Sequence, residues 1–157
     1  MPTAILIRPA RRKEPVNKKQ PDPQAKHCFA AWRTVPQWGM HLNLTGQTVA
    51  VFGSSNGIGR AIAEGFVAEG CRVRGFDRAP HPGLETTTGD VTSFDQVEAF
   101  AATIEAIDHV VFSVGAGSGK FGFPFWNLEP GDWARVLAIN LIGAVNAAHA
   151  FATALIA

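Results

Sequence analysis

Residues Thr48–Asp77, TVAVFGSSNGIGRAIAEGFVAEGCRVRGFD, decide the fold of this chain. The apolar run Thr48–Phe52 predicts a buried strand, and the glycine-rich turn Gly53–Gly59 follows it directly. A second apolar segment, Arg72–Phe76, predicts the next strand, which ends on Asp77. Glycines let a backbone approach closely, and the amino end of a helix offers free N–H groups and a positive dipole end. The order strand, glycine turn, helix, strand therefore predicts a site for a diphosphate.

Between these two strands the apolar residues recur with a helical period. Ile58, Ile62 and Phe66 are spaced four residues apart, so they would form one buried stripe of a helix over Gly57–Glu69. Gly70 follows at the position where a glycine commonly ends a helix, because that position favours a left-handed backbone.

The rest of the chain repeats this alternation of strand and helix. Strands are expected at Leu84–Thr88 and His109–Val114, and helices from Ser93 onward and over Pro130–Ile156. Alternating strands and helices are typical of a parallel sheet with right-handed crossovers. The predicted fold class is α/β: a Rossmann-like doubly wound parallel sheet, truncated after about four strands, with strand order 3-2-1-4.

Two finer features of these later segments are also predicted. Ser93 and Gln96 have the spacing of a capping box at the start of a helix. The inner face of that helix would be formed by Phe94, Val97, Ala101 and Ile104. The strand His109–Val114 is almost wholly apolar, which is typical of a strand covered on both faces.

Residues 1–39 differ in composition from the remainder. They hold eight Lys and Arg against two acidic residues, a net charge of +6, while the remainder holds six against eleven, a net −5. Six of the ten prolines lie here, and the segment has too little apolar surface to offset the entropy of ordering it. We expect a disordered basic arm, with a start site placed too far upstream, and a dinucleotide-binding domain over residues 40–157. Nucleic-acid binding and a targeting role are the weaker alternatives for the arm, and no nucleic-acid partner is predicted.

The cysteines and histidines predict neither disulfides nor metal. Cys28 and Cys71 are far apart in dissimilar surroundings, and the five histidines show no ligand spacing. A reducing, cytoplasmic location is therefore expected. No uninterrupted apolar run approaches the length of a membrane span, so no membrane partner is expected.

The identity of the nucleotide is predicted from the turn and the acid after the second strand. Gly53, Gly57 and Gly59 have the spacing GxxxGxG, and Asp77 lies about 20 residues further on. An acid at that place hydrogen-bonds ribose hydroxyls and repels a 2′-phosphate, which favours NAD over NADP. Arg78, next to the acid, argues in the opposite direction.

With these residues the chain resembles the classical short-chain dehydrogenase/reductase family over about 42–157, roughly the N-terminal, cofactor-binding half of a member. Gly53–Gly59 resembles the family's TGxxxGxG turn, with Phe52 in place of the threonine. Residues 89–92, GDVT, resemble its segment after the third strand. Residues 133–140, WARVLAIN, resemble the helix that carries its active-site asparagine.

The resemblance implies a set of site residues. It places the active-site asparagine at Asn140, and it suggests that Asp90 and Val91 touch the adenine ring. The cofactor-binding residues that it implies are Gly53, Ser55, Asn56, Gly57, Ile58, Gly59, Asp77, Asp90, Val91, Val114 and Gly115. One motif departs: where the family usually has NNAG, this chain has FSVG at 112–115, so the asparagine that ties the sheet together is missing.

The resemblance also implies an activity, the transfer of a hydride between nicotinamide and an alcohol or carbonyl substrate. Family members complete this chemistry with a serine and a YxxxK pair, whose tyrosine exchanges a proton with the carbonyl oxygen. This chain contains no tyrosine. We therefore expect an incomplete chain that is inactive alone. The alternative is a non-catalytic dinucleotide-binding module or remnant.

The last predicted helix, 130–156, is apolar nearly all round. A sheet covers only one side of a helix, so the second side needs another partner. The resemblance implies that the equivalent helix of a second subunit supplies it, and a homo-oligomer through the 130–156 helix is predicted. The uncovered edge of the strand at 109–114 is a further site for pairing or aggregation.

Overall fold

The computed structural model describes residues 42–120 and 127–156, and these contain one parallel sheet. Its strands are β1 (Thr48–Phe52), β2 (Arg72–Asp77), β3 (Thr86–Thr88) and β4 (His109–Phe112), in the order β3-β2-β1-β4. The predicted fold class and strand order are confirmed. The basic arm and residues 121–126 lie outside the described residues.

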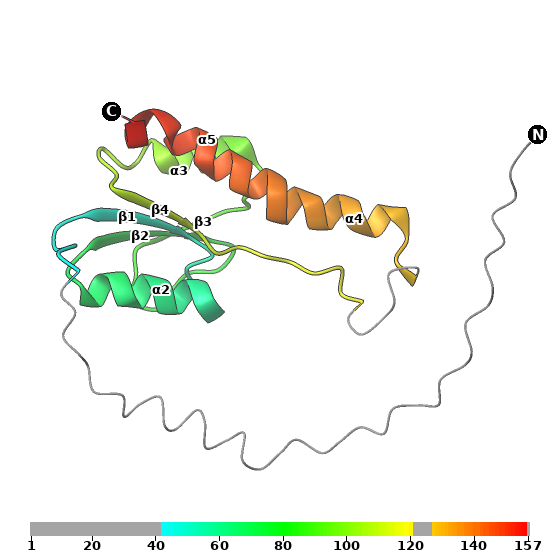
Figure 1. The fold of residues 1–157 in the computed structure, drawn as a ribbon, viewed down its shortest axis with the longest axis horizontal. Coiled ribbons are helices and arrows are strands. Elements are labelled where there is room, and N and C mark those ends of the chain that lie inside the picture. The colour runs from blue at the N-terminus through cyan, green and yellow to red at the C-terminus, as the bar shows by residue number, and fades with distance from the viewer. Residues whose placement is uncertain (1–41, 121–126, 157) are drawn as a thin grey trace, which may run out of the picture. The chain divides into compact units, whose positions relative to one another are not determined.

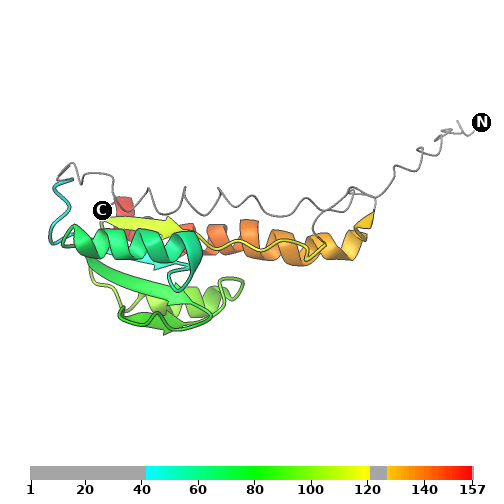
Figure 2. The ribbon, with the colours of Figure 1, turned by 90° about the horizontal axis from the view of Figure 1, so that it is seen from below.

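Helices cover both faces of the sheet. α2 (Gly57–Ala68) packs on one face, and α3 (Phe94–Ala101) and α5 (Gly143–Ile156) pack on the other (Figure 1). α4 (Pro130–Leu137) precedes α5, and the π-helical turn η3 (Ala138–Ile142) joins the two helices. Figures 1 and 2 both show α4 extending beyond the sheet, alongside the segment that follows β4.

The central strand β1 divides the core into two clusters. Phe52 faces α3 and α5, where its ring lies 5.3 Å from that of Phe76 and 5.6 Å from that of Phe100. Val49 and Val51 face α2 and pack with Ala63. All residues of β1 are buried, because both faces of this strand are covered and it pairs on both edges.

The buried face of α2 differs from the predicted stripe. Ile58 is 76% exposed, whereas Gly59 and Ala63 are fully inside. A Cβ built on Gly59 would lie 2.1 Å from the carbonyl oxygen of Gly53, so the helix meets the turn there without room for a side chain. Ile62 and Phe66 are half-buried beside this contact. The predicted end of the helix is confirmed, since Gly70 has a φ of +82°.

The predicted capping box of α3 is wrong. The Ser93 side chain makes no cap hydrogen bond, and Gln96 Oε1 instead accepts from the backbone N–H of Asp90 at 2.9 Å. The tight turn before the helix brings that N–H within reach of Gln96. Of the predicted inner face, Val97 is buried, and Ala101 and Ile104 are partly buried against the same cluster; Phe100, which the pattern did not indicate, is buried with them.

The edge strand β4 is shorter and less covered than predicted. It ends at Phe112, and its residues are half-buried. Within the described residues β4 pairs only with β1, so one of its edges has no strand beside it.

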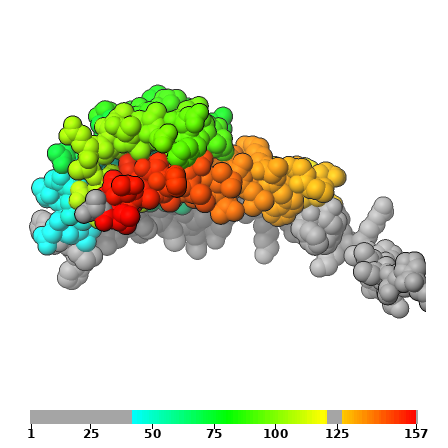
Figure 3. All heavy atoms as spheres, turned by 90° about the horizontal axis from the view of Figure 1, so that it is seen from above, coloured from blue at the N-terminus to red at the C-terminus, as the bar shows by residue number. Residues whose placement is uncertain are grey.

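The expectation that no apolar segment approaches the length of a membrane span is wrong for the helical segment Pro130–Ile156. Its 27 residues are long and apolar enough, by length and composition alone, to cross a membrane. A minor part of this apolar segment serves the core: Gly143, Ala147 and Phe151 are buried against the sheet side, and 22% of its apolar window is buried. The outer side of α4 and α5 (orange to red) lies at the surface in Figure 3.

Candidate nucleotide site

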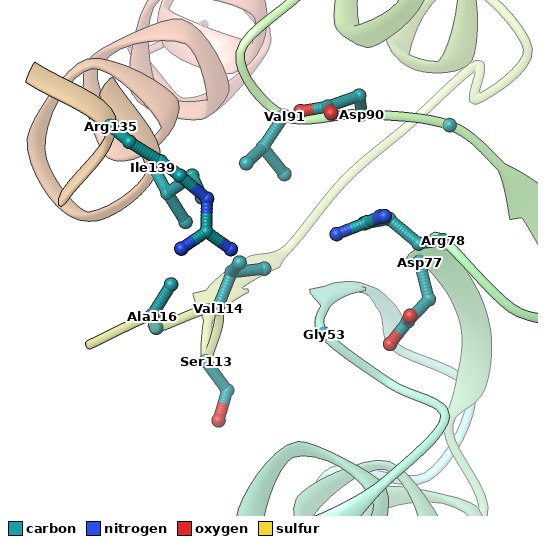
Figure 4. Close-up of a pocket in the computed structure, with 12 residues that line it drawn as sticks. Gly53, Asp77, Arg78, Asp90, Val91, Ser113, Val114, Ala116, Arg135 and Ile139 are labelled. Atoms are coloured by element: carbon teal, nitrogen blue, oxygen red, sulfur yellow. The ribbon is translucent and has the colours of Figure 1, made fainter. Parts of the chain in front are cut away.

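A pocket of about 240 Å³ lies where β1, β2 and β4 end, facing α4 and the π turn (Figure 4). This is the carboxyl edge of a parallel sheet, where ligands of such folds usually bind. The lining residues come from five separate segments: Gly53, Asp77, Arg78, Gly89, Asp90, Val91, Ser113, Val114, Gly115, Ala116, Arg135 and Ile139.

The glycine turn is shaped by close backbone approaches. Gly53 has a φ of +83°, and a Cβ there would lie 2.9 Å from the carbonyl oxygen of Ser113. Asn56 caps α2, because its Oδ1 accepts from the N–H of Gly57 at 2.7 Å. The turn therefore brings the first turn of α2 close to the end of β1.

The acid after β2 is bonded to this turn. Asp77 Oδ2 accepts from the N–H of Ser55 at 2.9 Å, and its Oδ1 accepts from the N–H of Ala79 at 3.2 Å. A carboxylate has about four acceptor positions, so Asp77 keeps capacity for ligand hydroxyls. These bonds hold the acid and the glycine turn as one unit.

The segment after β3 contributes a second acid and an apolar side chain. Asp90 accepts from the N–H and the hydroxyl of Thr92, at 2.9 and 2.8 Å, and these bonds lower the pKa of its carboxyl, as does nearby Arg78. Val91 is buried under α5: Asn146 donates to its carbonyl at 2.9 Å, and a Cβ on Gly143 would lie 2.7 Å from its Cγ2. α5 therefore sets the position of Val91 in the pocket.

The predicted active-site asparagine binds backbone groups. Asn140 lies in η3, where its Oδ1 accepts from the N–H of Ala116 at 3.1 Å. Its Nδ2 donates to the carbonyls of Ala116 at 2.7 Å and Val136 at 2.8 Å. Both donors of the amide are thus used, and the side chain ties the segment after β4 to the helix.

Phe112, which stands where the resemblance expects an asparagine, packs with apolar side chains. The ring of Phe112 lies 6.1 Å from that of Phe52, and Gly143 leaves room for it on α5. Ser113 keeps only the backbone link, donating its N–H to the carbonyl of Phe52 at 2.9 Å.

The structure brings together part of the predicted set. Six predicted cofactor residues line the pocket: Gly53, Asp77, Asp90, Val91, Val114 and Gly115. The other five, Ser55, Asn56, Gly57, Ile58 and Gly59, form the turn beside it. The lining residues outside the predicted set are Arg78, Gly89, Ser113, Ala116, Arg135 and Ile139. For Arg135 and Ile139 the four-residue spacing on the helix before Asn140 was a usable signal.

The parallel sheet with helices on both faces defines a Rossmann-like α/β domain. A model of the short chain dehydrogenase family matches residues 47–157, and the chain belongs to that family. Members of the family generally bind NAD or NADP.

Similar proteins include several dehydrogenases. Dehydrogenase/reductase SDR family member 6 of Rattus norvegicus is 34% identical over 106 residues, which cover 62% of this chain and 42% of the relative. D-threitol dehydrogenase of Mycolicibacterium smegmatis is 32% identical over 117 residues, covering 64% and 44%. The ligand-free structure of Thermoplasma acidophilum aldohexose dehydrogenase has a TM-score of 0.66 and 32% identity, covering 73% of this chain and 46% of that one. The chain thus spans less than half the length of these relatives.

Proposed function

We propose that this chain supplies the cofactor-binding part of an NAD-dependent oxidoreductase, which transfers a hydride between nicotinamide and an alcohol or carbonyl substrate. The observation that carries the proposal is the hydrogen bond between Asp77 and the N–H of Ser55, which joins a ribose-binding acid to a diphosphate-binding turn. The names of two relatives, D-threitol dehydrogenase and aldohexose dehydrogenase, support this class of substrate.

The residues present fit such a cofactor. Gly57 of the turn has a φ of +55° and open space where a Cβ would stand, and Asp77 has unused acceptor capacity. We assign the diphosphate to the turn 53–59, the adenosine ribose to Asp77, and the adenine ring to Asp90 and Val91. Val114 and Gly115 would form the wall beside the cofactor.

The preference for NAD over NADP is tested by titration with NADH and NADPH. We expect NADH to bind at least about tenfold more tightly, since the Asp77 carboxylate repels a 2′-phosphate. Asp77→Ala should erode the difference, and Asp77→Asn, which keeps an acceptor for Ser55, separates charge from folding. Arg78→Met is the matched control, because it removes a positive charge where Asp77→Ala removes a negative one. It should weaken the binding of NADPH more than that of NADH. Preference of the unmutated chain for NADPH would contradict this assignment.

We propose that the chain by itself binds the cofactor without turnover. The second candidate function, a non-catalytic dinucleotide-binding module, predicts the same result. The 157 residues contain no tyrosine, and the amide of Asn140 is not a proton donor at neutral pH. Absorbance of NADH with a panel of alcohols and carbonyls should therefore stay constant. Turnover by the pure chain would overturn the claim.

We also propose that the helix 130–156 mediates a homo-oligomer. Its outer side exposes large apolar residues, among them Trp133 (46%), Leu137 (50%), Leu141 (55%) and Val145 (53%). Such a patch is typical of an interface. Light scattering should give a mass above that of one chain, and Leu141→Glu should lower it, whereas a stable monomer would contradict the proposal.

Residues 1–39 are proposed to be a dispensable arm of a protein that works in the cytoplasm, without nucleic-acid or membrane partners. The contrast in charge and proline content supports this division. A chain that begins at Met40 should keep the melting temperature and cofactor affinity of the full chain. A large loss of either would show that the arm packs on the domain.

A further inference from the structure

Two arginines extend toward the pocket from different elements. Arg78 follows β2, and Arg135 comes from the last turn of α4. Figure 4 shows their guanidinium groups pointing toward the middle of the pocket from opposite sides. Arg78 lies close enough to Asp90 to lower the pKa of that carboxyl. Arg135 is exposed and forms no salt bridge with any residue that the structure describes.

The π turn holds Arg135 on the inner side of the helix. Arg135 and Ile139 line the pocket, and the buried residues Gly143, Ala147 and Phe151 continue the series at four-residue steps. In an α-helix each step of four drifts by about 40° around the axis. Across the π turn at 138–142 a step of four residues rotates in the opposite direction, because a π-helix has more than four residues per turn. The series therefore stays on one side from the core to the pocket.

The space in front of Arg135 suits a flat ring. Val91, Val114 and Ile139 line it with apolar surface, and the carboxylates of Asp77 and Asp90 offset the positive charge of Arg78, which also lines it. Its volume of about 240 Å³ is below the ~300–1,000 Å³ of pockets that enclose whole ligands. The space thus fits one ring system of a larger ligand.

We propose that Arg135 is a cofactor-binding residue that stacks its guanidinium plane on the adenine ring. An arginine plane is attracted to the face of an aromatic system, and its weak hydration favours such stacking. The inference rests on the proposed function and adds to it a contact from α4, a helix outside the strand–turn–helix unit that binds the diphosphate. It makes the affinity for the adenosine half depend on how that helix is placed.

The test compares probes for the two halves of the cofactor. 5′-AMP and nicotinamide mononucleotide are titrated against the full chain and its Arg135→Met and Arg135→Lys variants, with NADH fluorescence as the competition signal. Arg135→Met, which keeps an apolar stem, should weaken 5′-AMP about five- to tenfold. Arg135→Lys, which keeps the charge but loses the plane, should recover only part of the loss. Nicotinamide mononucleotide should bind all three equally.

Arg72→Met is the control, because it removes an exposed arginine at the amino end of β2, the opposite edge of the sheet. Equal loss in this control, or an unchanged affinity of Arg135→Met for 5′-AMP, overturns the inference. A larger loss for 2′,5′-ADP than for 5′-AMP shows that Arg135 binds a phosphate, which also overturns it. So does an unmutated chain that binds NADH but not 5′-AMP. If the unmutated chain binds none of these nucleotides, the proposed function itself fails.

Discussion

The unit β1–α2–β2 and the segment from β4 to α5 build the same pocket by different means. In the first, the glycine turn, the helix cap and Asp77 lie within 30 residues of one another, and the side-chain oxygens of Asn56 and Asp77 accept from backbone N–H groups of the turn. In the second, the links join distant segments: Asn140 bonds Ala116, 24 residues away, and Asn146 bonds Val91, 55 residues away. Local steric rules control one wall of the site, and tertiary packing controls the other.

Burial follows the same division. The residues of β1 are all buried, whereas those of β4 are half-buried at an open edge. We therefore expect substitutions in the first unit to act mainly on folding. Substitutions in the second should act on the pocket as much as on stability.

The largest effect is expected where the turn meets its helix. Gly59→Ala places a Cβ 2.1 Å from the Gly53 carbonyl oxygen, a backbone clash that no rotamer relieves. We expect a loss of at least about 3 kcal/mol in the free energy of unfolding, measured by urea denaturation. Gly65→Ala, on the same helix with open space around it, should stabilise by about 0.5–1 kcal/mol. Similar losses in both would show that helix propensity, not the close approach, controls this wall.

A smaller effect is expected at the corresponding contact of the second region. Gly143→Ala places a Cβ 2.7 Å from a side-chain methyl of Val91, a contact with a side chain and not with backbone. We expect a loss of about 1–2 kcal/mol in unfolding free energy and weaker binding of 5′-AMP, because Val91 lines the pocket. Gly131→Ala, in open space in the first turn of α4, should lower neither the unfolding free energy nor the affinity for 5′-AMP. If Gly143→Ala keeps both the unfolding free energy and the 5′-AMP affinity of the parent, tertiary packing does not control this side of the pocket.

Asn140 tests the link across the second region. Asn140→Ala removes three side-chain hydrogen bonds at an exposed position, so we expect a loss of only about 1 kcal/mol. The accompanying change should be in Ala116, whose amide NMR shift is predicted to move while that of Ser55 stays. Unchanged spectra at Ala116 would mean that the link does not persist in solution.

The smallest effect concerns pH and belongs to the segment after β3. Thr92→Val removes the hydroxyl that donates to Asp90 and leaves the backbone donor, so the pKa of Asp90 should rise part of the way toward its ordinary value. Because the pKa is lowered in the folded state, its stabilising effect is present at neutral pH and lost as pH falls through it. The variant should thus be slightly less stable than the parent at pH 7 and equal to it in strong acid, as measured by melting temperature. A difference that grows on acidification has the wrong sign for this account.

The same division explains what was predictable from the sequence. Strand order, the bounds of β1 and α2, and the roles of Gly53 and Gly70 follow from local patterns. The stripe of α2 was misplaced because a close approach selects small residues, which hydrophobic periodicity does not reveal. The capping box failed because Asp90 competes for Gln96, and the π turn at 138–142 interrupts what the apolar pattern predicts as one continuous helix. Arg135 was missed because its position in the pocket depends on how its helix is rotated about its axis, which no sequence motif encodes.

The paired bonds between Asn140 and Ala116 have a consequence for how the site assembles. The side-chain amide offers Ala116 a donor and an acceptor side by side, much as a neighbouring strand would offer a peptide group. The segment beyond Phe112 is thereby held by a helix in place of a strand. The amide proton of Ala116 should exchange slowly with solvent only while the helix that carries Asn140 is docked, so its exchange rate reports how often this side of the pocket opens. A nucleotide that binds at the glycine turn should lower this exchange rate if the two sides of the pocket close together.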